Sequence, residues 1–147
     1  MYERALYASW GDMDFNSHMR NTAFLDKSAD LRMMFFAEHG FPMAEFLRLR
    51  IGPVIQRDEL EYFKEVALLQ EIRVTLSIAG LSEDGSRFKM KNDFFRPDGK
   101  LCASVTSTGG WLDLGQRKLA APPEALLQAL RTLPRAEPFE VMTSSLR

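Results

Sequence analysis

One segment limits the possible folds more than any other: a long helix that is apolar on nearly all sides. No glycine or proline occurs over residues 22–38, and the composition favours a helix. Asn21 or Thr22 is placed to cap its start, and Gly40 followed by Pro42 is expected to end it. A helix with so many apolar side chains is not stable with one whole face exposed to water, so other parts of the chain must bury it. Its apolar side chains are Phe24, Leu25, Ala29, Leu31, Met33, Met34, Phe35, Phe36 and Ala37.

Strands in the rest of the chain can supply this cover. Apolar and polar residues alternate over residues 72–78, which is typical of a sheet with one buried face. Turn-forming residues at 83–85 and 97–99 join neighbouring strands, so the sheet is expected to be antiparallel. The other expected elements are strands over 2–9, 52–63, 88–94 and 101–111 and short helices over 43–49 and 124–131. The sequence therefore predicts a single α+β domain over residues 1–147, in which an antiparallel sheet is wrapped around a long central helix.

The charge balance and the cysteine count exclude several classes of protein. With 19 basic and 20 acidic side chains, the formal net charge is -1, so nothing draws the chain to nucleic acid or to an anionic membrane. Cys102 is the only cysteine, which excludes an intrachain disulfide and a zinc site built on thiolates. The histidines are not spaced as a metal-binding pair, and no apolar run is long enough to cross a membrane. We therefore expect a cytoplasmic protein with no metal, no nucleic-acid partner and no membrane partner.

The loop that precedes the long helix, residues 11–21, is unusually rich in polar side chains. Backbone N–H groups at a helix N-terminus can stabilise the charge that forms on an attacked carbonyl oxygen. A neighbouring carboxylate can attack that carbonyl or activate a water molecule. From the residues alone, Asp14 could have this role or could only shape the loop as a hydrogen-bond acceptor. The polar residues of the loop are Asp12, Asp14, Asn16, Ser17, His18, Arg20 and Asn21.

The loop also carries a motif that resembles a known family. The 4-hydroxybenzoyl-CoA thioesterase-like branch of the hot-dog superfamily opens with Asp-x-Asp, then Gly-His-Val-Asn-Asn, and then its central helix. In this chain the matching residues are Asp12, Asp14, His18, Met19 and Asn21. The similarity continues downstream through Asp30 and Arg32, through Arg57, Glu59 and Tyr62, and through the stretch from Asp113 to Pro122.

Two positions depart from this family pattern. Ser17 stands where the family usually has glycine, and Arg20 stands where it has the first asparagine. Glycine gives the backbone freedom at this point, so Ser17 bears directly on the shape of the loop.

The resemblance implies a hot-dog fold and an acyl-CoA thioesterase, which hydrolyses an acyl-coenzyme A thioester to the free acid and CoA. Asp14 would be the nucleophile or general base, and His18 is the second candidate catalytic residue. Coenzyme A would enter as part of the substrate, so no separate cofactor is expected. The resemblance also implies a homodimer or homotetramer, in which two sheets pair edge to edge. The candidate substrate-binding residues are Asn16, Ser17, Met19, Asn21 and Arg57.

Three alternatives remain open at this stage. Asp26 and Asp30 share one face of the helix, where other hot-dog branches have their catalytic carboxylate. A non-catalytic acyl-CoA-binding protein would use the same cavity. An enoyl-CoA hydratase of this fold would show Gly-Asp-x-Asn-Pro-x-His, whereas the segment from Asp14 to His18 is shorter and lacks the Gly and the Pro. For the thioesterase, we expect the acyl group in an apolar tunnel beside the helix, bordered by Phe24, Phe35 or Phe94.

Overall fold

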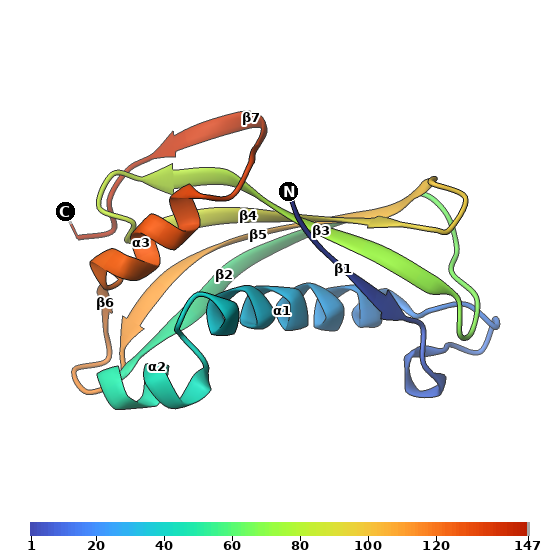
Figure 1. Ribbon diagram of the computed structural model, residues 1–147, viewed down its shortest axis with the longest axis horizontal. Helices are drawn as coiled ribbons and strands as arrows, with labels where there is room; N and C mark the ends of the chain where they lie inside the picture. The colour runs from blue at the N-terminus through green and yellow to red at the C-terminus, as the bar shows by residue number, and fades with distance from the viewer. Residues whose placement is uncertain (147) are drawn as a thin grey trace.

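In the computed structural model, which describes residues 1–146, a curled sheet lies across one side of a central helix (Figure 1). The helices are α1 (Asn21–Glu38), α2 (Met43–Leu49) and α3 (Glu124–Arg131), and a 3₁₀ turn, η1, covers Trp10–Asp12. The strands are β1 (Tyr2–Tyr7), β2 (Ile51–Tyr62), β3 (Glu71–Ser82), β4 (Arg87–Phe95), β5 (Leu101–Asp113), β6 (Lys118–Ala120) and β7 (Arg135–Met142). The predicted α+β class and both short helices are confirmed.

The strands follow the order β1-β3-β4-β5-β2, and every neighbouring pair on this path is antiparallel. Two further strands extend the sheet, since β6 pairs with the end of β5 and β7 runs parallel to the end of β3. β7 comes from the tail beyond Pro134, for which the sequence predicted no structure. The chain reaches it through α3, and this helical crossover is what permits a parallel neighbour.

The core lies between α1 and the concave face of the sheet. Phe24 of α1 meets Phe94 of β4 edge to face, with ring centroids 5.2 Å apart. Phe36 meets Trp111 of β5 at 5.7 Å. Burying each such ring contributes roughly 1.5–3 kcal/mol, and edge-to-face geometry adds to this. The apolar residues that alternate with polar ones in the sequence thus form the inner face of the sheet.

The predicted antiparallel sheet curls over one side of α1, whereas the expected long central helix is not confirmed. α1 has 18 residues, and its outward side carries the exposed carboxylates of Asp26 and Asp30. Between the buried stripe and this polar side, Leu25, Ala29 and Met33 are only half-buried. The apolar residues therefore extend beyond the area that one sheet can cover.

The start of α1 also differs from the prediction. Arg20 occupies the N-cap position with extended backbone and no side-chain capping bond, and Asn21 is the first helical residue. Instead of capping, the Arg20 side chain bonds Thr22 Oγ1 at 2.9 Å and the carbonyl of Gly11. Within the described residues, no helix has the length and apolar character needed to span a membrane.

Candidate active site

Asp12 holds the polar loop in shape. Its carboxylate accepts bonds from the Ser9 N–H at 2.9 Å and the Ser9 hydroxyl at 2.7 Å, and it pairs with Lys27 Nζ of α1 at 2.9 Å. Burial alone would raise the pKa of Asp12, but the bonds from Lys27 and Ser9 outweigh it and hold the pKa below its usual range. Asp12 is thus ionised, and its carboxylate has a structural role in holding the loop against α1.

Asp14 is held differently. Its Oδ1 accepts the backbone N–H groups of Asn16 at 2.8 Å and His18 at 3.1 Å. Its own N–H donates to the His18 carbonyl at 2.8 Å, which closes the turn. Its Oδ2 has no hydrogen-bond partner among the described residues, and the side chain is exposed. One oxygen therefore fixes the carboxylate while the other is open to a ligand or water.

Ser17 keeps the backbone shape for which the family uses glycine. Its φ is 65°, in the left-handed region that side chains other than glycine rarely adopt. For an L-residue this conformation costs about 1–2 kcal/mol. The turn of Asp14 requires it, because Asn16 and His18 must both aim their N–H groups at the same oxygen.

The N-terminus of α1 lies next to this turn. The N–H of Met19 donates to the Val66 carbonyl at 2.8 Å, which anchors the end of the loop. The N–H groups of Asn21 and Thr22 have no acceptor among the described residues, as is usual for a first helical turn. They carry the positive end of the helix dipole, so they are suited to a developing oxyanion.

Asp14 lines two pockets. The first, which we call the helix-side pocket, has a volume of about 270 Å³. His18 lies in its wall, with Nε2 at 2.9 Å from Glu65 Oε2, and the Tyr62 hydroxyl donates to the Asn21 carbonyl at 3.2 Å. The full lining is Asp14, His18, Met19, Asn21, Phe24, Tyr62, Phe63, Lys64 and Glu65.

The second, the loop-side pocket, has a volume of about 480 Å³. Trp10, Met13, Phe15 and Leu68 supply its apolar surface, and Ser17 and Asp14 supply its polar groups. Asp14 is the one described residue that lines both pockets.

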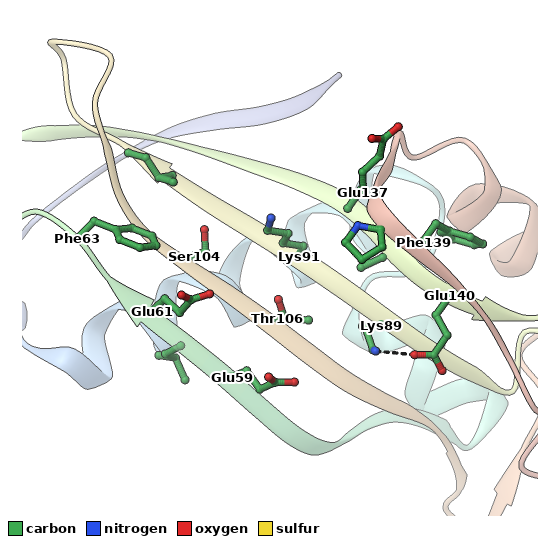
Figure 2. Close-up of a pocket in the computed structure, with 15 residues that line it drawn as sticks. Glu59, Glu61, Phe63, Lys89, Lys91, Ser104, Thr106, Glu137, Phe139 and Glu140 are labelled. Atoms are coloured by element: carbon green, nitrogen blue, oxygen red, sulfur yellow. Dashed lines mark hydrogen bonds and ion pairs between the residues drawn. The ribbon is translucent and has the colours of Figure 1, made fainter.

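A larger hollow of about 930 Å³ lies on the outer face of the sheet (Figure 2); Asp14 does not line it, but Phe63 lines both this hollow and the helix-side pocket. Figure 2 shows Glu59 and Glu61 of β2 and Lys89 and Lys91 of β4 on the same face of the sheet, with β5 between them. Glu140 pairs with Lys89 at 2.8 Å. Glu137 adds a further carboxylate to its lining. Acidic groups outnumber basic groups, so this hollow does not favour the phosphates of coenzyme A.

The structure brings most of the predicted site residues together. Asp14, His18, Met19 and Asn21 share the helix-side pocket, and Ser17 joins Asp14 in the loop-side pocket. Two predicted residues lie elsewhere. Asn16 contributes its backbone N–H to Asp14 but lines neither pocket. Arg57 is exposed in the middle of β2, 3.5 Å from Glu59, and also lines neither.

Seven lining residues were named in the sequence analysis neither as site residues nor in the family resemblance: Trp10, Met13, Phe15, Phe63, Lys64, Glu65 and Leu68. Trp10 immediately precedes the polar loop and Phe15 lies within it, and the signal that could have found them is two large aromatic residues next to so many polar ones. Lys64, Glu65 and Leu68 come from the connection after β2, and no local pattern marks them. Within residues 1–146, no group of three or more His, Cys, Asp or Glu side chains is arranged to hold a metal ion.

Comparison with known proteins shows which family and which solved structures this chain is similar to. Residues 8–130 match the model of the thioesterase-like superfamily. A Staphylococcus aureus protein whose structure was determined in complex with CoA superposes with a TM-score of 0.80 at 20% identity, covering 90% of this chain and 85% of that one. No curated protein sequence matches.

Two solved thioesterases have the same fold. A gentisyl-coenzyme A thioesterase gives a TM-score of 0.78 at 18% identity, over 88% of this chain and 99% of that one. A 1,4-dihydroxy-2-naphthoyl-CoA thioesterase from Synechocystis gives 0.79 at 14% identity, over 88% and 95%. At these identities the likeness concerns the fold.

Proposed function

Because this chain belongs to the thioesterase-like superfamily, we propose that it is an acyl-CoA thioesterase that converts an acyl-coenzyme A thioester to the free acid and CoA. One observation carries the proposal: the Asp14 carboxylate has one oxygen fixed by backbone N–H groups and the other open, between two pockets and beside a helix N-terminus. The solved gentisyl-CoA and dihydroxynaphthoyl-CoA thioesterases and the CoA-bound relative support the substrate class.

In the proposed reaction Asp14 acts as general base. Its Oδ2 takes a proton from a water molecule while the water oxygen bonds to the thioester carbon. The carbonyl oxygen gains negative charge, which the free N–H groups of Asn21 and Thr22 stabilise. The C–S bond then breaks, and the thiolate of CoA receives the proton from Asp14. One water molecule is consumed, and one acid and one thiol are formed.

Direct attack is the alternative role for Asp14. Its Oδ2 would bond to the thioester carbon, CoA would leave, and water would then hydrolyse the resulting anhydride. A single turnover in ¹⁸O-water separates the two routes, because attack on the Asp14 carbon of an anhydride leaves ¹⁸O in that side chain.

The neighbouring residues have supporting roles in this proposal. His18, held by Glu65, presents its imidazole to the helix-side pocket and helps to position the carbonyl. Ser17, Met19 and Asn21 contact the substrate from the pocket walls, while Asn16 acts through its bond to Asp14. No separate cofactor is required, since coenzyme A is part of the substrate.

A homodimer or homotetramer forms the second part of the proposal. β2 is a 12-residue edge strand that pairs only with β5 among the described strands. Open edges of this length are usually covered, and the half-buried Leu25, Ala29 and Met33 lie on α1 outside the area that the sheet covers. In a dimer paired through β2, Arg57 would lie at the interface, and we propose that it contacts CoA there.

The test of the proposed activity is thiol release. The purified protein is incubated with acetyl-, hexanoyl-, octanoyl- and benzoyl-CoA in the presence of a thiol reagent, with boiled protein as the control. Release of CoA supports hydrolysis. Binding without release would show a non-catalytic acyl-CoA-binding protein, and loss of the enoyl absorbance of an enoyl-CoA without thiol release would show a hydratase.

A further inference from the structure

The position of Asp14 between two pockets limits how a thioester can lie. The reacting carbon must be beside Asp14 Oδ2, and the molecule extends from that carbon in two directions, toward the acyl group and toward the sulfur. Because Asp14 lines both pockets, each branch has one pocket available to it.

The two pockets differ in chemistry. The helix-side pocket contains His18, Lys64 and Glu65 together with the amide of Asn21. These groups suit the amides of the pantetheine arm, and Lys64 supplies a cation on the side where phosphates follow. The loop-side pocket offers Trp10, Met13, Phe15 and Leu68 and no charged group besides Asp14.

The large apolar side chains of the loop-side pocket are also unusually exposed to solvent. Phe15 is fully exposed, Trp10 is 80% exposed and Leu68 is 40% exposed. A contiguous exposed apolar surface beside a reactive group is typical of a ligand site. By contrast, two of the three expected tunnel residues are packed in the core: the ring centroids of Phe94 and Phe24 lie 5.2 Å apart, and those of Phe35 and Tyr2 also 5.2 Å. The third, Phe24, lines the helix-side pocket.

From this geometry we propose that Trp10, Met13, Phe15 and Leu68 form the acyl-group site, which selects bulky apolar acyl groups over small ones. This inference rests on the proposed thioesterase function. The acyl group covers the bare aromatic surface and the CoA arm leaves through the helix-side pocket. An apolar site of this kind discriminates by about 10- to 200-fold for each methylene it contacts.

The first experiment measures preference. The ratio of kcat/KM for octanoyl-CoA to that for acetyl-CoA is compared between wild type, Phe15→Ala and Leu68→Trp. Phe15→Ala should lower this ratio at least tenfold, and Leu68→Trp, which fills the pocket, should lower it further. Phe63→Ala is the matched control, because Phe63 is a half-exposed aromatic that lines the helix-side pocket. A ratio that changes in Phe63→Ala but not in Phe15→Ala would overturn the proposal.

The second experiment does not depend on hydrolysis. The chain has two tryptophans, and Trp111 is fully buried whereas Trp10 is exposed. Adding the non-hydrolysable octanoyl-CoA thioether should shift the tryptophan emission to shorter wavelength, and Trp10→Phe should abolish the shift. A shift without thiol release would refute the thioesterase activity and leave the acyl site standing. Thiol release from octanoyl-CoA with no shift at saturating thioether would refute the acyl site alone.

Discussion

At the residue scale, the site separates two aspartates that are two positions apart. Asp12 accepts bonds from Ser9 and is paired with the Lys27 cation, all on its Oδ2. Asp14 accepts only backbone N–H groups, has no cationic partner among the described residues, and lines both pockets, which Asp12 does not. A neighbouring cation stabilises a carboxylate and makes it a weaker base, whereas a carboxylate held by backbone N–H groups at a pocket is both positioned and available. The two residues should therefore respond differently to the same substitution.

Asp14→Asn should lower kcat by at least about 100-fold, because an amide of the same shape is neither a base nor a nucleophile. The melting temperature should stay within a few degrees of wild type, since the amide oxygen can still accept the bonds from Asn16 and His18. Steady-state kinetics and thermal unfolding of the same preparation check both. Asp30→Asn, on the exposed side of α1, is the control. Normal turnover in Asp14→Asn together with loss in Asp30→Asn would move the catalytic role to the helix.

Asp12→Asn should act on stability more than on rate, and its effect should depend on pH. The pKa of Asp12 is lowered by folding, so the ionised carboxylate stabilises the fold above the ordinary aspartate pKa of about 3.9, and this contribution is lost as the pH falls through the lowered value. We expect a loss of about 1–3 kcal/mol at pH 7, from the charged hydrogen bonds. Melting temperatures of wild type and variant should differ at pH 7 and converge in acid. A difference that is the same at every pH would contradict the Lys27 pairing.

Ser17→Gly should stabilise the protein, because glycine adopts a φ of 65° without steric cost. The gain is limited to about 1 kcal/mol by the greater entropy of glycine in the unfolded chain, which corresponds to about 2–4 °C in a protein of this size. Ser17→Val is the opposing variant and should lower the melting temperature, since a β-branched residue is strained there. A destabilising Ser17→Gly would show that the serine side chain matters more than the backbone.

At the scale of elements, α1 has two functions that lie at different places along it. Its N-terminus supplies N–H groups to the site, and its middle supplies the apolar stripe of the core. The ring contacts between Phe24 and Phe94 and between Phe36 and Trp111 show that this stripe is packed against the sheet. The same helix therefore couples the position of the site to the stability of the core.

Phe94→Ala tests whether the space beside α1 is core or tunnel. Phe94 is fully buried, so the variant should lose about 3–5 kcal/mol of unfolding free energy. The preference of the remaining folded protein among acyl chain lengths should equal that of wild type. Chemical denaturation and kcat/KM across the acyl-CoA panel measure the two effects. A shift of the kcat/KM preference toward longer acyl chains would instead support the expected tunnel beside the helix.

At the scale of the whole molecule, the fold leaves one long edge open. β1 and β7 share the outer edge of β3, but β2 has a neighbour on one side only in the described part of the chain. The apolar residues of α1 that the sheet does not cover add to this incomplete burial. Self-association through this edge would cover both at once.

Ala29→Arg should disrupt this association. Ala29 is half-buried and lies between Leu25 and Met33 on α1, whereas Ala37 is exposed on the same helix. Light scattering at micromolar concentration should give at least a dimer mass for wild type and for Ala37→Arg, and a lower mass for Ala29→Arg. A monomeric wild type would refute the proposed assembly.

The elements were predictable because their signals are local. The absence of glycine and proline over α1, the alternation along β3 and β4, and the turns between the strands depend on residues that are close in sequence. The candidate Asp14 was also found locally, since the whole loop motif lies within a few residues of it. The parallel pairing of β7 with β3 could not be predicted locally, because it depends on where the chain lies after α3.

The sequence by itself determined the helices, the strands from β1 to β5, the polar loop and the carboxylate at its centre, because periodicity and turn chemistry are properties of neighbouring residues. The tertiary structure decided what surrounds that carboxylate. Tyr62 reaches Asn21 across 41 residues of chain, and Leu68 comes to lie beside Trp10 to complete a pocket. These contacts depend on strand pairing and on the packing of α1, and such long-range geometry has no local signature.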